Sequence, residues 1–514
     1  MVVNKILNQL KQHSLIETIL AALILSLGFS FRLQQYIFNR SLWLDEALLA
    51  NNLVSKSIVS LLFQALDFDQ AAPPGFLFLV KIGNRLFGTS DIALRLVPFA
   101  AGVFALITAY FIARTVLKTA LGRVAFLCSV AFSPSLIYYS SEFKQYSLDV
   151  FLAVLLILMG LSYKKWKMGF LIFTLCGMIF PWFSHPTVFV LAAIGVTDLV
   201  VGIIGKDDQG VKKLFLMVMA WLLSFTIFYI VSLHMVTSDG FLQNFWAHGY
   251  APFPPMSWED AQWYLNRIYQ WTFLSFQQLG PPPVTAIQPW FLAHNIILSI
   301  SLWIGGVFLW FRSKRLFGIL IGPVLITLLM SIPELYPFSG RLILFLVPLG
   351  ILIISNFVDV LASQTLQWRK SVAVIFFVFS VTVSLRVSLP NLLHPFDNHN
   401  IKGAMYFLKD QYREGDVVAI SRWSLPAYTF YSRNIRLENL PMAAVIEVQN
   451  DVKQMISSLC GYGEPGRVWI LFSHRFSERH KLLDILAEKY DVLSRWEGEG
   501  SGIYLWDLTN VCYP

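Results

Sequence analysis

Long apolar segments recur along the first three quarters of the chain. An α-helix rises about 1.5 Å per residue, so about 20 mostly apolar residues cross the roughly 30 Å hydrocarbon core of a bilayer. Eleven segments approach this length: 15–31, 92–113, 121–139, 147–163, 168–184, 186–204, 214–233, 290–311, 316–332, 340–360 and 371–389. No small-residue cleavage site follows the first segment, so we interpret it as a retained span rather than a signal peptide. The pattern predicts a mainly α, polytopic membrane protein with about eleven transmembrane helices.

Beyond residue 389 the pattern changes to short, alternating elements. They follow in the order helix 400–413, strand 417–421, helix 446–459, strand 468–472, helix 475–489 and strand 502–508. This order is typical of a small α/β layer. Of the 125 residues from 390 to 514, 28 are charged, against 42 of the 389 before them. We therefore expect a transmembrane domain, 1–389, and a soluble α/β domain, 390–514. Cys460 and Cys512 both lie in the second domain, and a disulfide between them is an open alternative if that domain faces an oxidising compartment.

Charge predicts the orientation of the chain. Only 14% of the residues are charged, where soluble proteins have about 25%, so a large soluble enzyme is excluded. Of the 26 Lys and Arg residues before residue 390, 16 lie in six short segments on one side of the alternating spans. The positive-inside rule places the N-terminus in the cytoplasm and residues 390–514 outside, and it explains the net charge of +8 without a nucleic-acid partner. The two long outer loops, 32–91 and 234–289, contain amphipathic stretches at 58–65 and 258–276 that suit helices at the membrane interface.

The first outer loop carries adjacent carboxylates. Asp45 and Glu46 stand in SLWLDEALLA, just past the first span. In a membrane-surface cleft, desolvation raises the pKa of a carboxylate and suits it to act as a base. The alternative is an N-terminal cap on an interfacial helix, stabilised by the helix dipole. Arg95, just inside the second span, is expected to face the bundle interior or a partner, for which Asp91 and Asp45 are candidates.

Two later outer segments add polar side chains. Glu142, Lys144 and Tyr146 alternate in SEFKQYSLD. They fit either a polar site with a cation and a hydroxyl or an interfacial anchor with a local ion pair. Arg341, which follows Tyr336 at the outer mouth of the ninth and tenth spans, either snorkels to the interface or binds a phosphate with its forked donors.

His185 is an isolated histidine in FPWFSHPTVFV, between two spans on the outer side. A histidine before a proline is more often a capping or interface residue than a ligand. No HxxxH, CxxC or HExxH spacing occurs near it, so the sequence gives little support for a transition-metal site.

Taken together, the outer segments resemble a known family. The Asp45-Glu46 pair, Pro73-Pro74 followed by aromatic residues and LFGTSDIALRLVPFAAG, ExKxYSLD at 142–149, and YPFSGR at 336–341 occur in this order. This order is similar to the bacterial family-39-like membrane glycosyltransferases of the GT-C type, relatives of the protein O-mannosyltransferases and of the aminoarabinose and lipopolysaccharide sugar transferases. The resemblance covers roughly residues 15–390 and implies a GT-C-like fold.

The resemblance also implies roles for individual residues. Asp45 would be the general base, with Glu46 beside it. The residues implied at the donor and phosphate site are Glu142, Lys144, Tyr146, Tyr336 and Arg341, with Arg95 and His185 as further candidates. Many relatives have His or Lys directly before the Pro pair, where this chain has Ala72, so Lys81 or Lys144 is expected to supply that phosphate contact. No metal ligand is implied, and the need for a divalent cation stays open.

The implied reaction is inverting transfer of a sugar from a polyprenyl-phosphate donor to a hydroxyl of a glycan, lipid or protein, at the outer face of a bacterial inner membrane. A lipid phosphate leaves readily, so such an enzyme needs one carboxylate to accept the acceptor proton and cations to hold the departing phosphate. A nucleophilic carboxylate, as in retaining glycosidases, is not needed.

Three other functions remain as alternatives. A polytopic transporter or lipid flippase would place its polar residues mid-membrane at broken helices, often in repeated halves, whereas the carboxylates here cluster in outer loops. A lipid-linked glycan polymerase or ligase would share the large outer loop but lack the early Asp-Glu pair. A structural anchor for the outer domain would not need eleven spans.

Overall fold

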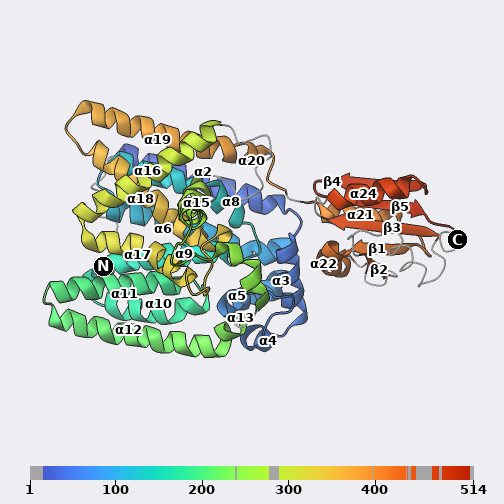
Figure 1. Ribbon diagram of the computed structural model, residues 1–514, viewed down its shortest axis with the longest axis horizontal. Helices are drawn as coiled ribbons and strands as arrows, with labels where there is room; N and C mark the ends of the chain where they lie inside the picture. Colours follow the sequence, from blue (N-terminus) through green and yellow to red (C-terminus); the bar gives the residue numbers. More distant parts are fainter. Residues whose placement is uncertain are drawn as a thin grey trace.

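The computed structural model describes residues 15–237, 240–276, 289–397, 399–435, 437, 442–446, 466–473 and 477–509. Figure 1 shows a body of long, roughly parallel helices with a small β-sheet beyond one end of it, built from the C-terminal part of the chain. The chain is therefore mainly α with a small α/β part, as the hydrophobic pattern predicts.

Nine helical segments in the described part of the chain are long and apolar enough to cross a membrane. They contain α2 (Leu15–Phe38), α6 (Asp91–Val116), α9 (Tyr146–Ser162), α11 (Thr187–Ile204), α12 (Asp208–Phe228), α16 (Pro289–Arg312), α17 (Lys314–Ser331), α18 (Val347–Ala362) and α19 (Gln367–Ser388). Three of these helices are extended by a short element: α9 by η1 (Tyr163–Lys165), α12 by η3 (Tyr229–Leu233) and α19 by α20 (Pro390–Leu393). A 3-10 helix, η5 (Gly340–Leu346), precedes α18. These nine coincide with nine of the predicted spans, so the chain is a multi-pass membrane protein.

The two other predicted spans, 121–139 and 168–184, form shorter apolar helices, so nine of the eleven predicted spans are long enough on their own in the described residues. Where a span was expected at 121–139, α7 (Ala120–Ala131) ends and α8 (Pro134–Tyr139) begins after a two-residue break. The second is α10 (Gly169–Ile179), followed by a 3-10 turn, η2 (Phe180–Trp182), that contains Pro181. Proline lacks the N–H that a continuing helix needs, so each span is interrupted although its composition stays apolar.

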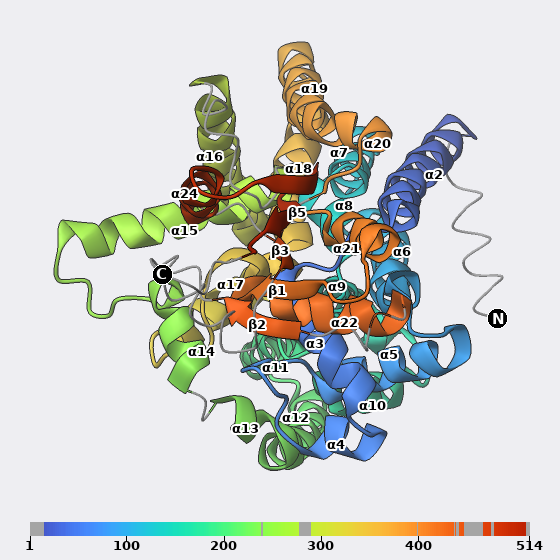
Figure 2. The same cartoon turned by 90° about the vertical axis from the view of Figure 1, so that its right-hand side faces the viewer.

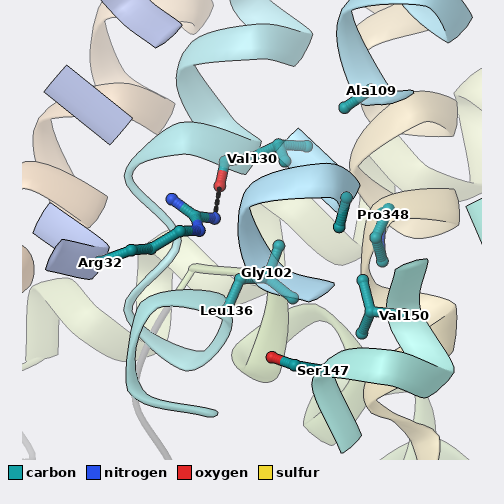
Figure 3. A pocket seen from close by; sticks show the side chains of 9 residues that line it. Arg32, Gly102, Ala109, Val130, Leu136, Ser147, Val150 and Pro348 are labelled. Carbon is teal, nitrogen blue, oxygen red and sulfur yellow. Dashed lines mark hydrogen bonds between the residues drawn. The ribbon is translucent and has the colours of Figure 1, made fainter. Parts of the chain in front are cut away.

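Arg32 satisfies the backbone at the end of α7. Its side chain, 1% exposed, donates from Nη1 to the Ala131 carbonyl at 3.0 Å and from Nη2 to the Val130 carbonyl at 3.1 Å. Figure 3 shows the guanidinium turned toward Val130, beside a cavity of about 10 Å³ that Gly102 and Ser147 also line. Arg32 thus serves as a C-terminal cap for a helix that ends inside the protein.

Ion pairs join the basic segments at the end of the helical body opposite the sheet. Three of them are Arg123–Glu17 (2.6 Å), Arg315–Asp198 (2.5 Å) and Arg312–Asp359 (3.4 Å). They come from the Lys- and Arg-rich segments on which the orientation prediction rests.

The first long loop forms helices at the end of the body that faces the sheet. These are α3 (Leu44–Ser55), α4 (Ile58–Phe63) and α5 (Pro74–Phe87). The second long loop contains α13 (His234–Thr237), α14 (Gly240–Phe245), η4 (Ala247–Gly249) and α15 (Trp258–Phe276). The two predicted amphipathic helices are confirmed as α4 and α15.

The C-terminal part contains a five-stranded sheet in the order β2-β1-β3-β5-β4. Its strands are β1 (Val417–Ser421), β2 (Met442–Ile446), β3 (Arg467–Ser473), β4 (Val492–Gly498) and β5 (Ser501–Asp507). β1 is parallel to β2 and β3, and β5 is antiparallel to β3 and β4. The helices are α21 (Ile401–Gln411), η6 (Arg422–Ser424), α22 (Leu425–Ile435) and α24 (Ser477–Ala487). The predicted helix 446–459, Cys460 and Cys512 lie outside the described residues, apart from Ile446 at the end of β2.

The sheet buries both faces. Val418 and Trp469 face a core shared with α21 and α22, and the neighbouring Ala419 and Ile470 face a core shared with α24. Successive residues point to opposite faces of a strand, which explains why these strands are apolar throughout. The first core continues beyond the C-terminal part into the first long loop, where α3 and α5 contribute buried side chains.

Candidate functional site

The Asp-Glu pair lies in the first turn of α3, where the helix dipole favours negative charge. The Trp43 N–H donates to Glu46 Oε2 at 2.9 Å, so Glu46 caps the helix. The Asp45 side chain pairs instead with Arg341. The alternative of a helix N-terminal cap, predicted for this pair, is therefore realised by Glu46.

Glu46 is buried in a dense set of donors. Arg95 donates to its carboxylate from Nε at 3.0 Å and from Nη2 at 2.9 Å, and the Phe143 N–H donates at 2.6 Å. Burial raises the pKa of Glu46, but the charges of Arg95 and Arg40 outweigh it, and the pKa lies below the ordinary value. Because its oxygens are engaged by the protein, Glu46 joins the loop to α6 and orients the residue before it.

Asp45 forms an ion pair with Arg341 of η5. Their side chains are 19% and 23% exposed, so both are accessible, unlike Glu46. The Arg341 guanidinium also lies over the rings of Tyr146 at 5.5 Å and Trp246 at 5.9 Å, within the range of cation–π contacts. Burial raises the pKa of Asp45, but the charges of Arg341 and Lys144 lower it further, so Asp45 is ionised at neutral pH.

Glu142 lies in the turn between α8 and α9 and is buried. Burial, and after it the charge of Glu46, raises the pKa of Glu142 to about 7. Its nearest cation is Arg40, whose Nη2 is 3.9 Å from Glu142 Oε2. Glu142 therefore changes its charge near neutral pH.

Lys144, two residues later, is also buried and faces the same cluster. Its Nζ donates to Gln70 Oε1 at 2.8 Å. Burial lowers the pKa of Lys144 to about 8, although the charge of Asp45 opposes the shift. The structure thus brings together Asp45, Glu142, Lys144, Tyr146 and Arg341, from three segments far apart in the sequence. We call these five residues, with Arg40, the outer cluster, after the segments that the sequence predicts to lie outside.

Besides Glu46 and Arg95, three predicted residues are not part of this cluster. Tyr336 donates from its hydroxyl to the Leu342 carbonyl at 2.8 Å. Lys81 donates to the carbonyls of Leu53 and Lys56 and so caps the C-terminal end of α3. Asp45 lies at the other end of this helix, about 15 Å away along its axis.

His185 packs its ring 5.7 Å from that of Phe228. Burial lowers the pKa of His185 to about 4, so the imidazole is neutral at physiological pH.

The position of Lys81 at the far end of α3 does not support the expected phosphate contact by this residue. Lys144 is therefore the lysine of the cluster.

Arg40 is the member of the outer cluster that sequence reasoning missed. It is 3% exposed, it donates from Nη1 to Ser141 Oγ at 2.8 Å, and it lies 4.2 Å over the Tyr138 ring. Its Nε and Nη2 have no hydrogen-bond partner among the described residues. The signal in the sequence is weak, because an arginine at the end of a span is ordinarily an interfacial anchor.

The outer cluster carries more positive than negative charge. Arg40, Lys144 and Arg341 face two carboxylates, Asp45 and Glu142, while Glu46 is neutralised by Arg95. Forked guanidinium donors and a lysine are well matched to a phosphate. Among the described residues, no three His, Cys, Asp or Glu side chains come together to hold a metal ion, and no step below uses one.

Comparison with known proteins identifies the fold. No family model and no curated protein sequence matches the chain. Two solved structures of ArnT from Cupriavidus metallidurans are similar. The one bound to undecaprenyl phosphate has a TM-score of 0.53 and 10% identity, with 95% of this chain and 97% of that chain covered. The apo structure has a TM-score of 0.52 and 12% identity over the same shares. The chain therefore has the fold of a GT-C-type membrane glycosyltransferase, as its sequence motifs imply.

Proposed function

We propose that this GT-C-fold protein transfers a hexosyl or pentosyl group from a polyprenyl-phosphate donor to a hydroxyl of a glycan, lipid or protein. The observation that carries the proposal is the pairing of Asp45, an accessible and ionised carboxylate, with Arg341 in a cluster that has excess positive charge. The similar ArnT structure, which holds undecaprenyl phosphate, supports the donor class.

Asp45 acts as the general base in this proposal. It accepts the proton of the acceptor hydroxyl while the acceptor oxygen attacks the anomeric carbon of the sugar. The bond from that carbon to the phosphate oxygen breaks, the configuration inverts, and polyprenyl phosphate leaves with both bonding electrons.

The cations of the outer cluster hold the departing phosphate. Arg341, Lys144 and Arg40 supply donors for the negative charge that grows on the leaving oxygen. A phosphate bound to Arg341 also competes for its ion pair with Asp45. Loss of that ion pair raises the pKa of Asp45, so donor binding makes the base stronger.

We place the site at the outer face of a bacterial inner membrane. The segments that form it lie at the end of the body that carries the C-terminal sheet, and the Lys- and Arg-rich segments lie at the other end. The positive-inside rule then makes the N-terminus cytoplasmic and the C-terminal part, which we take as a separate domain beginning near residue 390, extracytoplasmic. At this interface the polyprenyl chain can stay in the bilayer.

The substitution Asp45→Asn tests the proposal. It keeps the shape of the side chain and removes the base, so turnover should fall by about 10²- to 10⁴-fold. Purified protein is incubated with a bacterial envelope lipid extract that contains polyprenyl-phosphate sugars, and the released polyprenyl phosphate is measured by mass spectrometry. A parallel assay with chelator, and then with Mg²⁺ or Mn²⁺, tests for a divalent cation.

The matched control is Asp69→Asn, an exposed carboxylate of the same loop. This variant should transfer at the wild-type rate. Retained turnover in Asp45→Asn would remove Asp45 from the base role. A wild-type protein that moves the intact donor across vesicles without releasing polyprenyl phosphate would favour the flippase alternative.

A further inference from the structure

The short segment that carries the chain from α2 into α3 is held by side chains from elsewhere. It spans residues 39–42 and begins with a left-handed residue, Asn39, with φ of 52°, a conformation that Asn adopts more readily than most residues. The carbonyls of Arg40 and Ser41 accept hydrogen bonds from Arg95 at 2.6 Å and 3.2 Å. Its conformation therefore depends on partners outside the segment.

Two of these partners belong to the C-terminal part. Lys402 of α21 donates from Nζ to the Asn39 carbonyl at 2.5 Å, and its backbone N–H donates to Ser41 Oγ at 3.1 Å. The Tyr431 hydroxyl of α22 accepts the Leu42 N–H at 2.7 Å. Two residues after Leu42, α3 begins.

The same two side chains meet at the start of α6. The Tyr431 hydroxyl donates to Asp91 Oδ2 at 2.7 Å, and Lys402 Nζ lies 2.9 Å from that oxygen. One turn later on α6, Arg95 donates hydrogen bonds both to the segment 39–42 and to Glu46. Tyr431, Lys402, Asp91 and Arg95 thus form one connected set, which we call the brace.

Packing joins the same parts of the molecule. Figures 1 and 2 both show α22 alongside α3, and the two helices are in contact. Asn51 of α3 donates from Nδ2 to the Pro426 carbonyl at 2.9 Å. The buried side chains of Leu53 on α3 and Met405 on α21 belong to one core. The C-terminal part therefore has a fixed position against the helix that carries Asp45.

We propose that the C-terminal part positions the general base. Tyr431 and Lys402 act as positioning residues, because they fix the backbone that enters α3 and so the place from which Asp45 reaches the acceptor hydroxyl. The inference rests on the proposed function. Two phosphate-binding cations, Lys144 and Arg341, come from segments other than 39–42, so loss of the brace should reduce turnover more than donor binding.

The variant Tyr431→Phe tests the brace, since it removes the hydroxyl and keeps the buried ring. A displacement of about 1 Å costs up to about 100-fold in rate, so kcat should fall by about 10- to 100-fold while the KM for the polyprenyl-phosphate sugar changes by less than about threefold. The matched control is Tyr428→Phe, a buried tyrosine one turn earlier on α22. It should keep wild-type kcat, and both variants should melt at similar temperatures.

A second pair of variants separates positioning from general stability. Lys402→Met should lower kcat as Tyr431→Phe does, and Lys402→Arg should restore much of it, because the guanidinium can still reach Asp91. Combining Tyr431→Phe with Asp91→Ala should cost less than the sum of the two single variants, since both remove the hydrogen bond between Tyr431 and Asp91. Wild-type kcat in Tyr431→Phe, or equal changes in kcat and KM, would overturn the inference.

Hydrogen exchange of residues 39–46 separates this inference from the proposed function. Exchange there should be faster in Tyr431→Phe than in Tyr428→Phe, whatever reaction the protein catalyses. An inactive wild type with this exchange difference would refute the proposed transfer and keep the brace. An active wild type with equal exchange in both variants would refute the brace alone.

Discussion

At the residue scale, two groups of the outer cluster, Glu142 and Lys144, titrate near neutral pH. A rise in pH makes the net charge of the cluster less positive at both groups. Burial raises the pKa of Glu142 to about 7 and lowers that of Lys144 to about 8. Below pH 7, Glu142 is neutral and Lys144 is charged, so the cluster is most positive. As the pH rises, Glu142 gains a negative charge and Lys144 then loses its positive one. Both changes weaken the attraction for a phosphate.

We therefore expect the donor KM to rise between about pH 6.5 and 8.5. In Glu142→Gln, which cannot ionise, the rise should begin about one pH unit later and be smaller. Initial rates at varied donor concentration, measured at each pH in wild type and variant, check this. A donor KM that is flat in the wild type, or an unchanged profile in Glu142→Gln, would contradict it.

The sequence predicted the cluster's members better than their roles. The motif resemblance named Asp45, Glu142 and Arg341, which the fold brings together although they are far apart in the chain. It also gave Asp45 the role of base, but it could not show that Arg95 holds Glu46 while Arg341 pairs with Asp45, because these contacts form only in the folded protein. Arg40 escaped notice because its role depends on burial in the folded protein.

At the scale of elements, apolar composition located all nine long apolar helices of the described residues but not where helices break. Composition is a good guide because a spanning backbone must satisfy its own hydrogen bonds inside the bilayer. The segment 121–139 is apolar on average, yet the chain breaks before Pro134. Hydropathy cannot detect such a break, since the freed carbonyls are satisfied by Arg32, about a hundred residues away in the sequence.

This explanation predicts that Arg32→Met destabilises the protein. It leaves the carbonyls of Val130 and Ala131 buried without these donors, which should reduce the free energy of unfolding by about 2–4 kcal/mol. Thermal unfolding of the purified protein in detergent measures the effect. The control Arg85→Met, at an exposed position on α5, should change stability by less than about 0.5 kcal/mol. Equal stability of the two variants would mean that α7 needs no cap from α2.

At the scale of the whole molecule, the two ends of the body differ in charge and in what they carry. One end holds the helices of the first long loop, among them α3 with Asp45, and the C-terminal sheet, and the other holds the paired basic segments (Figure 1). The proposed reaction needs the first end outside the cytoplasm, where a polyprenyl-linked sugar can meet an acceptor that never enters the cell. Orientation is therefore a test of function as well as of topology.

Single cysteines on exposed positions report this orientation directly. In a background whose four native cysteines are replaced by serine, Gln64→Cys in the first long loop and Asp410→Cys on α21 should react with a membrane-impermeant maleimide in intact spheroplasts. Lys212→Cys on α12 should react only after the membrane is opened, since it lies in a Lys-rich segment that the positive-inside rule keeps in the cytoplasm. Labelling of Lys212→Cys in intact spheroplasts would reverse the orientation. Asp45 would then face the cytoplasm, where nucleotide-activated sugars rather than lipid-linked ones are the abundant donors, and the polyprenyl-phosphate reaction would lose its physical basis.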